Sequence, residues 1–64
     1  MRITVKDDRF WVLGYIEDQS NGDKIVKDAS FRVIGYYRRS SDTVIDENFR
    51  IVAHGYAPGI LFNR

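Results

Sequence analysis

The residue types that could carry out catalysis are few in this chain of 64 residues. His54 is the only histidine, and it is the one side chain suited to acid–base catalysis near neutral pH. The sequence has no cysteine, which excludes disulfide bonds and thiolate ligands to a metal. A serine nucleophile needs a base held beside it. The serines all occur in polar segments expected to be turns, at Ser20, Ser30, Ser40 and Ser41. These residues therefore predict a protein that is not an enzyme.

Three aspartates recur at similar intervals and raise the question of a calcium site. Asp7, Asp28 and Asp46 each precede an apolar run by a few residues. Calcium takes six to eight oxygen ligands, usually from several acidic residues close together. One aspartate per turn is explained more simply by its carboxylate accepting a hydrogen bond from the backbone two residues later. Gly14 and Gly35 follow apolar runs but precede no helix, so they do not indicate a phosphate-binding loop. We expect no metal and no cofactor.

The chain contains an internal repeat. Residues 6–15 align with residues 27–36 at an offset of 21 (27 minus 6), with Lys, Asp, Phe, Val, Gly and Tyr coinciding. A third copy follows at an offset of 18 (46 minus 28), which places Phe49 on Phe31 and His54 on Tyr36. Because His54 occupies a tyrosine position of the repeat, a packing role is favoured for it over a catalytic role.

Each copy predicts a β-hairpin, since its apolar runs are rich in Val, Ile, Phe, Tyr and Thr and are separated by polar turn segments. We expect one all-β domain over residues 1–64, a meander of about six strands near 2–6, 9–17, 24–28, 31–38, 43–46 and 49–54. The three hairpin repeats cover about 2–17, 24–38 and 43–56, and an apolar tail covers 57–64. Three similar hairpins predict pseudo-threefold character and a barrel- or flower-like shape.

This pattern resembles small bacterial β-hairpin repeat proteins called beta-flowers. Their units share an Asp-x-x turn, an aromatic or basic residue and a Val/Ile-Gly-Tyr ending, as in residues 28–36 here. The resemblance covers residues 4–54, and Trp11 and His54 depart from it. It implies hairpins arranged radially about a pseudo-symmetry axis. It implies no activity.

Alternation of side chains along a strand divides the repeat into two faces. The first face is expected to form the core, with a large, a medium and a small residue in each copy: Phe10, Val12, Gly14, Phe31, Val33, Gly35, Phe49, Ile51 and Ala53. The second face is too apolar to be left in water and predicts an interaction surface. It comprises Trp11, Leu13, Tyr15, Arg32, Ile34, Tyr36, Arg50, Val52 and His54. Either the tail at residues 60–62 or a partner could cover it.

Composition limits the classes of partner. The net charge of +1, from 10 basic and 9 acidic residues, is too small to indicate electrostatic binding to nucleic acid or to an anionic membrane. No apolar run approaches the roughly 20 residues of a membrane-spanning helix. The first six residues lack the apolar stretch of a signal peptide, which favours the cytoplasm.

The sequence thus predicts a small, non-catalytic protein-interaction or self-assembly module. A homo-oligomer is expected, with a dimer favoured, because open sheet edges recruit other strands and a short chain without disulfides has a thin core. The alternative is a small nucleic-acid-binding β-domain. In such a domain bases would stack on Trp11, Tyr15 and Tyr36, beside Arg32 and Arg50.

Overall fold

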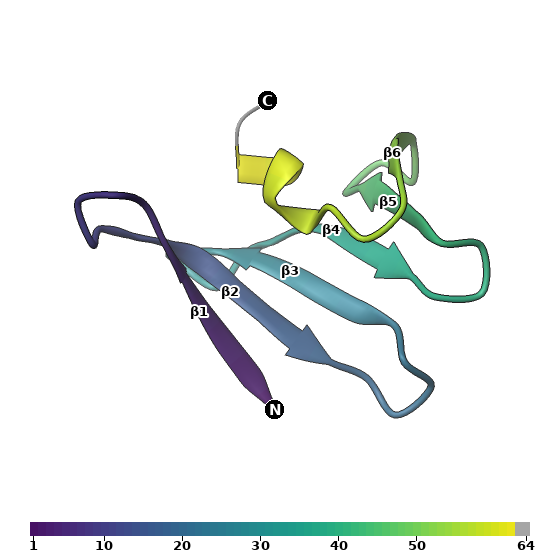
Figure 1. Cartoon of the computed structure of the whole chain (residues 1–64), viewed down its shortest axis with the longest axis horizontal. Coiled ribbons are helices and arrows are strands. Elements are labelled where there is room, and N and C mark those ends of the chain that lie inside the picture. The colour runs from purple at the N-terminus through teal and green to yellow at the C-terminus, as the bar shows by residue number, and fades with distance from the viewer. Residues whose placement is uncertain (63–64) are drawn as a thin grey trace.

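The computed structural model, described here for residues 1–62, is one antiparallel sheet of six strands in sequence order (Figure 1). The strands are β1 (Arg2–Lys6), β2 (Val12–Asp18), β3 (Lys24–Asp28), β4 (Val33–Arg38), β5 (Thr43–Asp46) and β6 (Ile51–His54), and a 3-10 helix, η1 (Pro58–Phe62), follows. The predicted all-β meander is confirmed. The sheet is not closed, because β1 and β6 each pair on one side only.

Three of the turns have the same hydrogen bonds. In each, the Oδ1 atom of the aspartate accepts hydrogen bonds from the backbone amides two and four residues later, with N–O distances of 2.8–3.0 Å. The three aspartates are Asp7, Asp28 and Asp46. The expected turn role of the aspartates is therefore confirmed. In each turn the residue in the left-handed conformation is the phenylalanine three residues after the aspartate: φ is 64° at Phe10, 65° at Phe31 and 64° at Phe49.

A β-bulge follows each of these turns. Val5 pairs with Gly14 while Lys6 pairs with Val12, so Leu13 has no partner across β1. The same irregularity leaves out Ile34 between β3 and β4 and Val52 between β5 and β6. Because a bulge adds one residue to one strand, side chains before and after it no longer alternate as in a regular strand.

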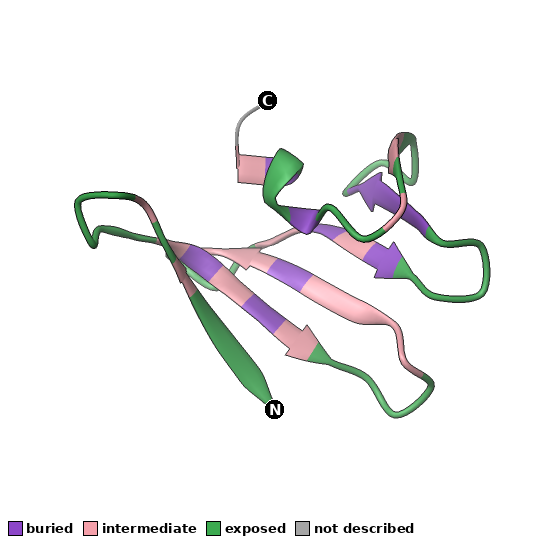
Figure 2. Ribbon diagram, viewed as in Figure 1, coloured by how far each residue is buried: buried purple, intermediate pink, exposed green. Residues whose placement is uncertain are grey.

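The core lies between the sheet and η1 (Figure 2). It consists of Ile16, Val26, Tyr37, Val44 and Leu61, of which Val26 and Val44 are fully buried. Leu61 lies over Gly35 and Phe62 lies over Gly14, where a Cβ atom would clash with each of them. Helix η1 therefore covers the face that carries the glycines, and residues 1–62 leave the face that carries Tyr15 and Tyr36 without a covering layer.

The prediction that the three phenylalanines form the core is wrong. Phe10 is 80% exposed, Phe31 50% and Phe49 64%. Each stands at the end of a turn with positive φ, outside the strand, so strand alternation does not apply to it. Val12 and Ile51, also assigned to the core, are exposed as well.

Tyr37 shows how a polar group is accommodated at the edge of this core. Its hydroxyl donates a hydrogen bond to Asp42 Oδ1 at 2.5 Å. That hydrogen bond is the main cause, and burial the second, of a raised pKa of the Tyr37 phenol. The ring also packs edge-on against Tyr56, which holds the segment between β6 and η1 to the sheet.

Within residues 1–62, no helix has the length and apolar character needed to cross a membrane.

Candidate interaction surface

Two stacked ring pairs occupy the uncovered face of the sheet. The rings of Tyr15 and Phe31 are 4.5 Å apart between centroids, with 4° between their planes. Tyr36 and Phe49 are 5.8 Å apart, with 5° between planes. In both pairs the tyrosine comes from the second strand of one hairpin and the phenylalanine from the turn of the next hairpin. The stacks thus connect successive hairpins.

Charged groups surround the first stack. The guanidinium of Arg2 lies 5.3 Å from both ring centroids, within the range of a cation–π interaction. Arg2 also lies 3.8 Å from Glu17, whose other carboxylate oxygen is 3.0 Å from Lys27 Nζ. Since Phe31 is 50% exposed, this end of the face offers an aromatic surface beside the Arg2 guanidinium.

A pocket of about 210 Å³ lies beside the second stack. Its wall combines polar loop residues with two rings: Gln19, Asn21, Asp23, Lys24, Ile25, Tyr36, Arg38 and Phe49. Lys24 Nζ donates to Asp18 Oδ1 at 2.6 Å. This hydrogen bond lowers the pKa of the Asp18 carboxyl and raises the pKa of the Lys24 ammonium. The pocket can therefore hold polar or aromatic groups of a partner.

The structure does not bring the nine residues of the predicted interaction face together on one face. Tyr15 and Tyr36 lie on the uncovered face, within the stacks. Ile34 and Val52 are bulge residues that pack against the core, and Leu13 is a half-buried bulge residue. The others are exposed, in the hairpin turns or on edge strand β6: Trp11, Arg32, Arg50 and His54.

The three turn phenylalanines and Arg2 were not predicted to be surface residues, although all four are exposed. The available signal was the spacing: an aspartate at the first position of a four-residue turn places the phenylalanine three residues later at the turn's end. That position requires positive φ in hairpins of this kind. Arg2 gave no signal, because its contact with Phe31 joins two different hairpins.

The order of the stacks leaves one ring without a partner at each end of the sheet. Phe31 stacks on Tyr15 and Phe49 on Tyr36, so each turn phenylalanine packs on the ring of the preceding hairpin. Phe10 belongs to the first hairpin and has no preceding tyrosine, and among residues 1–62 it stacks on no ring. His54 has the tyrosine position in the last hairpin, and it receives no phenylalanine from residues 1–62.

Replacing two equivalent phenylalanines by glycine should have opposite effects on stability. A left-handed φ costs an L-residue roughly 1–2 kcal/mol, and glycine avoids this cost. Glycine also makes the unfolded chain more flexible, which offsets about 0.5–1 kcal/mol of the gain. We expect Phe10→Gly to raise the free energy of unfolding by about 0.5–1 kcal/mol, because Phe10 stacks on no ring of residues 1–62. Phe31→Gly loses a stack of about 0.5–1.5 kcal/mol and the contact with Arg2, so it should lower that free energy.

Urea unfolding of both variants at low protein concentration measures this difference. Equal stabilisation by the two changes would show that the Tyr15–Phe31 stack contributes nothing. Destabilisation by Phe10→Gly would show that the φ of 64° is not a strained conformation for Phe10.

Comparison with protein-family models, with curated proteins and with solved structures finds no significant match to this chain.

Proposed function

We propose that this chain is a small, non-catalytic self-assembly module that binds other protein surfaces, its own copies first, through its exposed turn rings. The observation that carries the proposal is Phe10. It is 80% exposed and has a φ of 64°, so its backbone conformation costs stability while its ring gains little from burial. Contact with another protein would bury the Phe10 ring and so offset the cost of its left-handed backbone conformation.

The proposal also takes the three hairpins as copies of one unit with pseudo-threefold character. Three features support this: the same aspartate hydrogen bonds, the same left-handed phenylalanine and the same bulge position in each. The bulges occur at Leu13, Ile34 and Val52, which keeps the offsets of 21 (34 minus 13) and 18 (52 minus 34) found for the repeat. Repeats whose faces are incomplete at the ends gain stability by adding neighbours.

The test is the molecular mass across a concentration series. We expect wild-type protein to exceed the 7.5 kDa of one chain at high micromolar concentration, with a melting temperature that rises with concentration. Phe10→Asn should weaken the association without harming the turn, since Asn tolerates positive φ. A 7.5 kDa species at every concentration, with a constant melting temperature, would refute self-assembly.

A second candidate function is binding of single-stranded nucleic acid. It is favoured by the uncovered aromatic stacks with Arg2, Lys27 and Arg38 near them, because bases stack on exposed rings beside cationic side chains. Titration with a labelled oligonucleotide tests it. True phosphate contacts weaken steeply with added salt, and Phe31→Ala should reduce the affinity further. Salt-independent or undetectable binding would exclude this candidate.

A further inference from the structure

We infer that copies of this chain join head to tail: Phe10 of one copy stacks on His54 of the next, and edge strand β1 pairs with edge strand β6. The inference rests on the proposed self-assembly and specifies its geometry. Its basis is the repetition inside the chain, where a turn phenylalanine twice packs on the ring of the preceding hairpin. Between copies, Phe10 and His54 would make the next stack of the same series.

The internal strand pairings define the register of this contact. Between β2 and β3, Tyr15 faces Lys27, the residue just before the turn aspartate. Between β4 and β5, Tyr36 faces Ile45, again the residue just before the turn aspartate. The same register across the copies places His54 opposite Lys6.

Two features of the edges agree with such a pairing. β6 is the second strand of its hairpin, as β2 and β4 are, and β1 is the first strand of its hairpin, as β3 and β5 are. A β6–β1 pairing would therefore be antiparallel, like the connections between hairpins within the chain. In addition, an edge strand presents backbone groups with no partner strand, and these favour pairing with another chain.

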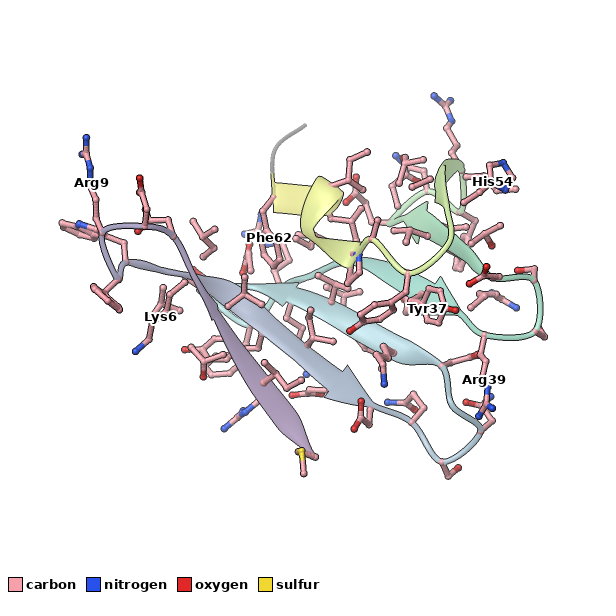
Figure 3. The ribbon with its side chains drawn as sticks, viewed as in Figure 1. Lys6, Arg9, Tyr37, Arg39, His54 and Phe62 are labelled. Atoms are coloured by element: carbon pink, nitrogen blue, oxygen red, sulfur yellow. The ribbon has the colours of Figure 1, made fainter. Side chains whose placement is uncertain are left out.

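The two ends cannot meet within one chain as it is folded here. Strands β1 and β6 are the two outer strands of the sheet, on opposite sides of it. Figure 3 shows Arg9, the neighbour of Phe10, and His54 at opposite ends of the molecule's long dimension. A contact between unlike ends of identical chains is heterologous, so it continues into a ring or a filament and does not stop at a twofold dimer. This geometry differs from the dimer favoured by the sequence. The interaction face predicted from the sequence included Ile34 and Val52, and both pack against the core.

The test uses two variants that each lose one end. Phe10→Lys removes the ring at the β1 end of the sheet. His54→Lys removes the ring at the β6 end and places a positive charge opposite Lys6. Both positions are exposed, so both variants should fold. We expect each variant alone to be monomeric under conditions where the wild type assembles. Mixed in equal amounts, they should form one-to-one pairs, because the Phe10→Lys variant keeps an intact β6 end and the His54→Lys variant keeps an intact β1 end.

Controls and outcomes separate this inference from the proposed function. Arg9→Lys, in the same turn as Phe10, should assemble like the wild type, and Phe10→Asn should replace Phe10→Lys if the latter does not fold. His54→Tyr should tighten assembly about threefold or more, since tyrosine is the ring in both internal stacks. If the wild type assembles but the mixture stays monomeric, or either variant alone still assembles, the head-to-tail geometry is wrong and self-assembly stands. If the wild type never assembles, both proposals are wrong.

Discussion

Leu61→Ala should lower the free energy of unfolding by about 2–5 kcal/mol, the cost of truncating a buried leucine. Leu61 is 3% exposed, and it connects η1 to the sheet through the core cluster that includes Val26 and Val44. A small domain has a total stability near 5 kcal/mol at the low end of the usual range. The variant should therefore keep only about 0–3 kcal/mol of that stability and unfold at a much lower urea concentration than the wild type.

Ile60→Ala is the matched control, because Ile60 precedes Leu61 in the same 3-10 helix and is 41% exposed. It should change the free energy of unfolding by less than about 1 kcal/mol. Urea unfolding followed by circular dichroism measures both variants. If both changes cost the same, η1 does not cover the sheet through Leu61.

Gly35→Ala should have the next largest effect, a loss of about 3 kcal/mol, at the upper end of what overpacking costs. A Cβ atom at Gly35 would lie 2.4 Å from the carbonyl oxygen of Ile45 and 2.6 Å from Leu61 Cδ1. The first of these is backbone of the neighbouring strand and cannot move without disturbing the β4–β5 pairing. The added methyl group therefore displaces either β5 or η1.

Gly59→Ala serves as its control, since a Cβ atom there would meet nothing within 4 Å and the backbone has no positive φ. That variant should be at least as stable as the wild type, because alanine reduces the entropy of the unfolded chain. Thermal unfolding compares the two. An unchanged melting temperature for Gly35→Ala would mean that Leu61 and β5 do not approach Gly35 as closely as the structure shows.

The sequence alone determined the strands and the turns. Both depend on short-range physics: runs of β-branched and aromatic residues favour strands, and an aspartate at the first turn position accepts amides two and four residues later. The six predicted strands match the observed ones, except that β2, β4 and β6 begin two or three residues later than expected and β2 ends one residue later, at Asp18. The turn at Asp28, for example, continues through a hydrogen bond from the Asp28 amide to the carbonyl of Arg32.

The candidate site was predicted only in part. Tyr15, Tyr36 and His54 were identified because they recur at one position of the repeat, which the sequence displays directly. The partners of the two tyrosines, Phe31 and Phe49, were assigned to the core instead. Assigning a face to a residue by alternation requires an unbroken strand between it and the reference residue, and the bulges interrupt that strand.

Tertiary structure alone decided which face of the sheet η1 covers. The sequence left the tail free to cover the tyrosine face. Packing favoured the other face because Gly14 and Gly35 have no side chains there, and the space above them admits Phe62 and Leu61. Burial depends on the fit between surfaces as well as on their hydrophobicity, and that fit exists only once the strands have paired. The rings of Tyr15 and Tyr36 therefore remain on the open face, stacked on the phenylalanines of the neighbouring turns.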